Sequence, residues 1–235
     1  MAIVDAVEPG DAFAEKLGLW IHYTDAITLS AVHNDSIASL PKMQPEAQFV
    51  PRAAVGIEFD RIQAGLINSI IKGCSPNLGK THIELSTLKP ELPMDIAAAY
   101  APYRRLYDTH QRDMELRIQP LRANVREALA KASPRLRKLA DLDAALERIL
   151  RDRESKLLSK VPVLLKKRFE QLFTAHLQTL ADTRQADNPA GWTQPGAWLA
   201  RFCNDMQMLL LAEVELRLQP TVGLIEALNN KTRNE

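Results

Sequence analysis

Residues 73–81 are the nearest that the chain comes to a phosphate-binding motif, because Gly79, Lys80 and Thr81 end the segment as such a loop ends. That loop requires a glycine where Cys74 stands, so that backbone amide groups can surround a phosphate. The segment also follows an expected helix, whereas a phosphate-binding loop follows a strand. We therefore interpret it as a loop that ends a helix.

Other arrangements of potentially catalytic side chains lack the required spacing. No histidine lies three or four residues from another or beside a cysteine, which predicts no metal site. The carboxylate pairs Asp141/Asp143 and Glu213/Glu215 stand two residues apart on expected helices, so their members point in different directions. We expect no catalytic, cofactor-binding or metal-binding residues and predict that the protein is not an enzyme. A composite active site would need a deep polar pocket that gathers several carboxylates or histidines.

A basic helix face is the clearest candidate interaction surface. Residues 103–168 hold 18 Lys and Arg against 9 Asp and Glu, a net charge of +9, whereas residues 1–60 have a net charge of −6. Such a helix could follow a nucleic-acid backbone or lie on an acidic membrane surface. Acidic residues alternate with the basic ones at helical spacing, however, which is typical of an ion-paired face. The candidate residues are Arg148, Arg151, Lys156, Lys160, Lys166, Lys167 and Arg168.

A second candidate contact set, formed by Trp20, Tyr23 and Asp25, lies in the first expected helix. Asp25 stands in an otherwise apolar or neutral run. A buried carboxylate without a partner is strongly destabilising, so a buried Asp25 would need a donor such as an arginine of the long helices. A structural polar contact is the simpler interpretation of this set.

One six-residue sequence occurs twice. Residues 115–120 (ELRIQP) return one hundred positions later as residues 215–220 (ELRLQP). Each proline lacks an amide proton and leaves free the carbonyl four residues earlier, at Leu116 and Leu216. We expect each helix to curve there around its neighbour. The alternative interpretation is that the two copies form a duplicated docking surface for a partner.

Apolar residues at spacings of three and four predict a chain of long helices. We expect helices over residues 11–32, 51–73, 95–132, 134–182 and 197–229, joined by proline-containing loops. Four prolines are expected to kink the long helices: Pro102, Pro120, Pro162 and Pro220. Because short connections imply antiparallel neighbours, we predict that Pro102, Pro162 and Pro220 lie at one height, where the three long helices bend together.

Composition supports an all-α protein of the cytoplasm. Of 235 residues, 46% are hydrophobic, 25% charged and only 6% aromatic, and the abundance of Leu, Ala, Arg and Glu favours helices. The N-terminus has no secretory signal pattern, and Cys74 and Cys203 are expected to be free thiols in a reducing compartment. We predict a kinked bundle of three long antiparallel helices with a smaller N-terminal helical region. The predicted division is an acidic region at 1–93 and the long-helix bundle at 94–235.

Several segments resemble one uncharacterised proteobacterial family, domain of unknown function 3348. They are residues 13–20 (FAEKLGLW), 22–30 (HYTDAITLS), 133–137 (SPRLR), 161–162 (VP) and 218–220 (LQP). The resemblance covers most of the chain and carries no activity. It implies further residues before Val4 in other members. It also implies genes beside ion-channel-type inner-membrane motor subunits and outer-membrane-protein-A-like proteins, hence a cytoplasmic accessory of such an assembly.

The most consistent function is that of a non-catalytic scaffold or adaptor. We expect it to bind another protein, itself helical, because an exposed apolar helix stripe can accept a second helix. Self-association is a further possibility, and no insertion into a membrane is expected. The alternative is a nucleic-acid-binding module that uses the basic helices of residues 103–168.

Overall fold

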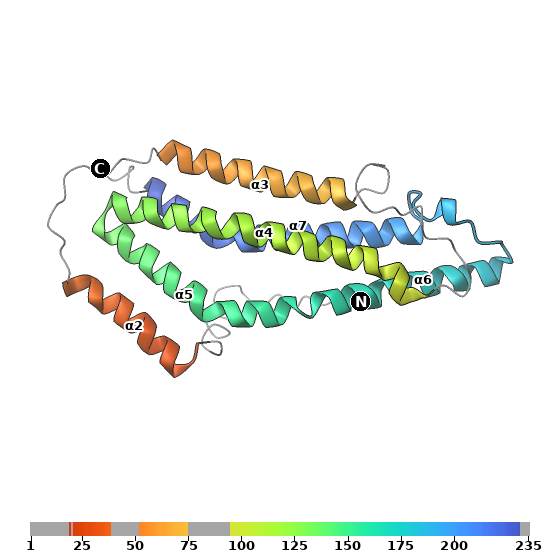
Figure 1. Cartoon of the computed structure of the whole chain (residues 1–235), viewed down its shortest axis with the longest axis horizontal. Coiled ribbons are helices and arrows are strands. Elements are labelled where there is room, and N and C mark those ends of the chain that lie inside the picture. Colours follow the sequence, from red (N-terminus) through yellow and green to blue (C-terminus); the bar gives the residue numbers. More distant parts are fainter. Residues whose placement is uncertain (1–18, 20, 39–51, 75–94, 231–235) are drawn as a thin grey trace.

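The chain folds into a bundle of helices (Figure 1). The computed structural model describes residues 19, 21–38, 52–74 and 95–230. Its α-helices are α2 (Tyr23–Ala38), α3 (Arg52–Cys74), α4 (Ile96–Ala132), α5 (Pro134–Leu158), α6 (Val161–Thr183) and α7 (Trp198–Asn230). There is no strand in these ranges, so the predicted all-α class is confirmed. None of the helices within these ranges is long and apolar enough to cross a bilayer.

Helices α4 and α7 form the centre of the bundle and run in the same direction (Figure 1). The hydroxyl of Tyr107 donates to the carboxylate of Glu213 at 3.4 Å, and the Gln111 side-chain amide donates to the same carboxylate at 2.6 Å. One turn further along α7, Arg217 donates to the side-chain oxygen of Gln111 at 2.7 Å. Helix α3 packs on one side of this pair, and α5 and α6 pack on the other (Figure 1).

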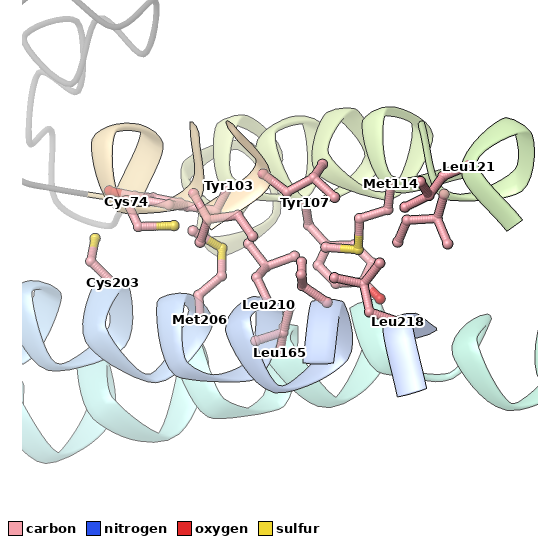
Figure 2. Packing of buried hydrophobic residues seen from close by; sticks show 14 of the residues in the cluster. Cys74, Tyr103, Tyr107, Met114, Leu121, Leu165, Cys203, Met206, Leu210 and Leu218 are labelled. Carbon is pink, nitrogen blue, oxygen red and sulfur yellow. The ribbon is translucent and has the colours of Figure 1, made fainter. Parts of the chain in front are cut away.

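Aromatic side chains fill the core where α4, α6 and α7 meet. The ring of Phe169 on α6 makes edge contacts with Phe202 and Trp198 on α7, at centroid distances of 5.1 and 5.2 Å. Tyr103 on α4 meets Phe202 in the same way at 5.2 Å. Further along, apolar side chains such as Met114 and Leu210 continue the contact between the two central helices (Figure 2). The bundle therefore has one continuous core.

Helix α3 shares this core, since its Leu66, Ile70 and Cys74 are buried in the same apolar cluster. The bundle thus contains α3 as a fourth helix, in addition to the three long helices that the sequence predicts. The predicted division between residues 93 and 94 lies outside the described ranges and stays a prediction.

The predicted ends of the long helices agree with the structure to within one or two residues, because capping residues set them. The Asp95 carboxylate accepts from the amide of Ala97 at 2.9 Å and starts α4. The Ser133 hydroxyl accepts from the amide of Leu136 at 3.3 Å and starts α5. The expected break at Pro162 is present, since α6 begins at Val161. The proline stands in the first turn of α6, where a backbone amide has no acceptor within the helix and its absence costs nothing.

The first helix differs from its prediction. Helix α2 continues to Ala38, so Asn34 and Asp35 do not end it, and most of the expected start lies outside the described ranges. Asp25 does not need an arginine. It is only partly buried, and its carboxylate accepts from the backbone amide of His22 at 3.0 Å, which caps the first turn of α2.

The prediction that three prolines share one height is wrong, because α4 and α7 are parallel and in register near Gln111 and Glu213. Pro102 lies before this level and Pro220 beyond it, so about 20 Å of helix separates them. Only Pro162 lies close to the Pro102 end, since the Tyr100 hydroxyl donates to its carbonyl at 2.8 Å. Pro220 lies instead near the level of Pro120. Whether the helices bend at these prolines stays a prediction.

The two copies of the six-residue repeat occupy equivalent places on the two central helices. Leu116 and Leu216 are 69% and 72% exposed. Arg117 pairs with Asp113 at 2.7 Å, and Arg217 pairs with Glu213 at 3.0 Å. Buried residues also recur one hundred positions apart: Ala99 and Leu199, Tyr103 and Cys203, His110 and Leu210, Met114 and Val214, Ile118 and Leu218, Leu121 and Thr221, and Ala128 and Leu228.

Replacing Phe169 with alanine is expected to lower the free energy of unfolding by about 3–5 kcal/mol, because it leaves a cavity at the meeting point of three helices. Urea denaturation followed by circular dichroism measures the change. Leu164→Ala on the same helix is the control, since Leu164 is exposed and its removal should change stability by less than about 0.5 kcal/mol. Equal losses from the two variants would contradict the assignment of the core.

Candidate functional site

Apolar and basic side chains gather on the outer surface where α5 meets α6. We call these six residues the junction patch: Lys156, Leu157, Lys160, Val163, Leu164 and Lys167. Leu157, Val163 and Leu164 are 51%, 55% and 60% exposed. Isolated apolar residues are common on protein surfaces, but three beside one another mark a contact surface more often than chance does.

Helix periodicity explains why this face points outward. The buried residues of α6 follow spacings of three and four: Pro162, Leu165, Phe169 and Phe173. The patch residues Lys160, Val163, Leu164 and Lys167 follow the same spacings. At about 100° per residue they fall on the side opposite the buried face. The core is therefore complete without them.

The lysines of the junction patch make no ion pair with any residue that the structure describes. The neighbouring cations of the predicted basic face behave differently. Lys166 lies 3.7 Å from Glu170, and Arg168 lies 2.8 Å from Asp205. Lys166 pairs along its own helix and Arg168 pairs with α7, so part of the charge of the predicted basic face is balanced within the bundle.

The other two predicted basic residues, Arg148 and Arg151, lie earlier in α5, away from its junction with α6. Arg151 has its guanidinium 3.9 Å from Glu147, a weak contact, and Arg148 is exposed. The seven predicted residues therefore do not form one uniform face. Lys156, Lys160 and Lys167 are brought together, and the remaining four are not.

The start of α2 lies near the end of α5. A side-chain nitrogen of Arg153 is 2.9 Å from the imidazole Nε2 of His22. The next residue, Tyr23, is 82% exposed, and Ile27 one turn later is 53% exposed. Of the predicted N-terminal set, Tyr23 is thus a surface residue near the junction, Asp25 is a helix cap, and Trp20 lies outside the described residues.

A buried polar network joins the two central helices. Glu213 is 7% exposed and accepts hydrogen bonds from Tyr107, Gln111 and Arg217. Burial raises the pKa of Tyr107 well above its usual value, and the negative charge of Glu213 raises it further. The hydrogen bonds of Glu213 therefore join α4 to α7.

A second network joins α4 to α5. Arg122 binds Asp143 with two bonds of 2.6 and 2.9 Å, and Arg126 binds both Asp143 and Glu147 at 2.6 Å. Burial by itself would raise the pKa of Asp143, but the hydrogen bonds and charges of the two arginines lower it below the usual value. This cluster stabilises the α4–α5 hairpin and leaves neither carboxylate free.

The two thiols are buried and remain protonated. Burial raises the pKa of Cys74 to about 12, with a further contribution from Cys203, and burial raises that of Cys203 to about 11. A thiol must lose its proton to act as a nucleophile or bind a metal. Within the described ranges no three His, Cys, Asp or Glu residues are grouped to hold a metal ion. Of the segment 73–81, only Gly73 and Cys74 are described, and both belong to α3.

Sequence reasoning missed the apolar half of the junction patch. The apolar spacing that predicts one helix over 134–182 includes Leu157 and Leu164, which would place both on the buried side of that helix. The helix instead breaks between Leu158 and Val161, and the buried face of α6 begins at Pro162. Restarting the apolar spacing at the predicted break is the signal that places Leu164 on the outer face.

Asp143→Asn is expected to lower the free energy of unfolding at neutral pH by about 1.5–3 kcal/mol, because charge-assisted hydrogen bonds to two arginines are weakened. The folded-state pKa of Asp143 is depressed. Its contribution is therefore full above the unfolded pKa of about 3.9 and is lost as the pH falls through the lower folded value.

Urea denaturation between about pH 7 and pH 2 tests this, since the difference from wild type should shrink toward the acid end. Asp141→Asn is the matched control, being exposed on the same helix. A constant difference at every pH would contradict the assigned role of the Asp143 charge.

Comparison with known proteins gives one match. A family model described as a protein of unknown function, DUF3348, matches residues 1–230. No curated protein and no solved structure matches the chain.

Proposed function

This chain belongs to the DUF3348 family, which is described as a protein of unknown function, and we propose that it is a non-catalytic helical scaffold or adaptor that binds another protein. The observation that carries the proposal is the junction patch, where Leu157, Val163 and Leu164 are all more than half exposed. Burying such a cluster against a partner removes apolar surface from water and favours association.

The polar groups inside the bundle support a structural role. Glu213 and Asp143 are each bound by at least two donors from other parts of the fold. Cys74 and Cys203 are protonated and buried. These contacts stabilise the relative positions of α3, α4, α5 and α7, as a rigid docking platform requires.

A helical partner fits the shape of the surface. Lys160, Val163, Leu164 and Lys167 form one row along α6 at spacings of three, one and three residues, which is the spacing with which two helices meet side by side. A second copy of this chain is another candidate partner, since its α6 would present the same row. Like charges on the two rows would then oppose such an arrangement.

Nucleic-acid binding remains the alternative, supported by three unpaired lysines. Several arginines of α4 that would extend a phosphate-binding surface are already engaged: Arg104 with Asp108, Arg117 with Asp113, and Arg122 and Arg126 with Asp143. A nucleic-acid interface is more basic than this and has no use for a leucine and valine cluster between its lysines.

The family resemblance adds a setting for the proposal. We propose that the protein works in the cytoplasm as an accessory to an inner-membrane motor-type assembly and that its partner belongs to that assembly. A soluble helical segment of such a partner would be able to reach the junction patch.

Affinity capture of the tagged chain from its native bacterium, with and without nuclease, tests the proposed function. We expect a protein partner in a fixed ratio that resists nuclease and is crosslinked to the bundle. A preparation in which partners disappear with nuclease treatment would support the nucleic-acid alternative. Recovery of no partner by crosslinking in living cells would contradict the scaffold proposal.

A further inference from the structure

We propose that the junction patch binds an acidic amphipathic helix of a partner protein. The inference rests on the proposed function and names the chemistry of the partner. The patch combines three apolar side chains that are each more than half exposed with three lysines that form no ion pair in the described ranges. Each of these two groups indicates one feature of the partner.

The lysines without ion pairs in the described ranges indicate that the partner is acidic. At several positions of the basic surface an acidic residue of the same helix or the next helix already balances the cation, as Glu170 does for Lys166 at 3.7 Å. Lys160 and Lys167 have no such partner in the described ranges. A carboxylate from another chain would therefore form an ion pair there without displacing one that exists.

The apolar pair between these lysines indicates that the partner segment is a helix with apolar residues on one face. Val163 and Leu164 lie between Lys160 and Lys167 on the outer face, and about 10 Å of helix separates the two lysines. A helix alongside α6 that carries Glu at positions i and i+7 and Leu at i+3 and i+4 matches this row. The long stems of the two lysines can cover the edges of the apolar contact while their charges meet the carboxylates.

The neighbouring elements extend the surface in one direction. Leu157 and Lys156 belong to the last turn of α5, and α2 begins beside the preceding turn through the contact of His22 with Arg153. A helix that lies along α6 would thus continue toward α5 and the start of α2 (Figure 1). The junction is therefore the end of the docking site at which more contacts are available.

The exposed leucines of the repeat differ from the patch. Leu116 lies beside Arg117, whose charge is already balanced by Asp113 at 2.7 Å. Leu216 similarly precedes Arg217, which is only 18% exposed and pairs with Glu213 at 3.0 Å. Each of these positions offers a single exposed leucine without an exposed valine or leucine beside it, so they serve as controls for the apolar contact.

Two labelled peptides of equal length and helix content test the proposal. The first carries Glu at i and i+7 and Leu at i+3 and i+4 in each heptad, and the second replaces every Glu with Lys. Fluorescence anisotropy with the full-length chain measures binding. We expect the acidic peptide to bind at least about tenfold more tightly than the basic one, because charge pairs at an interface contribute more than a kilocalorie each.

Two double variants then locate the contact. K160E/K167E is expected to weaken binding of the acidic peptide by about tenfold or more and to improve binding of the basic peptide. V163S/L164S should weaken both by removing the apolar contact, and L116S should change binding by less than about twofold. All substituted side chains are exposed, and circular dichroism confirms that each variant is folded.

Other results would overturn the proposal. Equal binding of the two peptides, or binding unaffected by K160E/K167E, would exclude an acidic helix at this patch. Sedimentation with phosphatidylglycerol vesicles without peptide binding would assign the patch to a membrane surface, and duplex DNA binding that depends on the lysines but not on Val163 and Leu164 would assign it to nucleic acid. A captured protein partner that is retained by K160E/K167E would leave the scaffold function standing and reject this site.

Discussion

The packing of α4 against α7 is the contact on which the rest of the structure depends. Two parallel helices that carry apolar residues on both sides of their contact cannot be covered by one further helix. Helix α3 covers one side, and α5 with α6 covers the other (Figure 1). Because each outer helix turns its single apolar face inward, an apolar residue on its outer face has no role in the core. This is why the exposure of Val163 and Leu164 is informative.

Charge in this protein is arranged in three environments. Buried carboxylates such as Glu213 and Asp143 are held by arginines and hydrogen bonds inside the bundle. Some surface cations, such as Arg104 and Arg168, pair with an acidic neighbour, which contributes little stability but cancels local charge. The unpaired lysines of the junction patch form the third environment, where charge remains available to another molecule. The net charge of residues 103–168 is therefore distributed between cations that are balanced within the bundle, such as Arg122 and Arg126, and cations such as Lys160 and Lys167 that form no ion pair in the described ranges.

Helix ends and helical periodicity depend on neighbouring residues and could be predicted from the sequence. The relative positions of helices that are distant in sequence could not. Ser133 with Pro134 marks the start of α5 because capping depends only on adjacent residues. The relative heights of Pro102 and Pro220 depend on the register of two helices one hundred residues apart, which loop lengths did not define. The lysines of the candidate site belong to the basic face that the sequence predicts, but which of its cations form ion pairs depends on the tertiary structure. The apolar members of the site were not predicted, because periodicity restarts at the break before Val161.

The central claim is that the outer face around the α5–α6 junction is the working surface of a rigid helical platform. Hydrogen–deuterium exchange of the full chain, alone and with its captured partner, tests it most directly. We predict slower exchange of peptides covering residues 153–171 in the complex, with no change around Leu116 or Leu216. Protection confined to the outer faces of α4 and α7, with exchange at the junction unaltered, would contradict the claim.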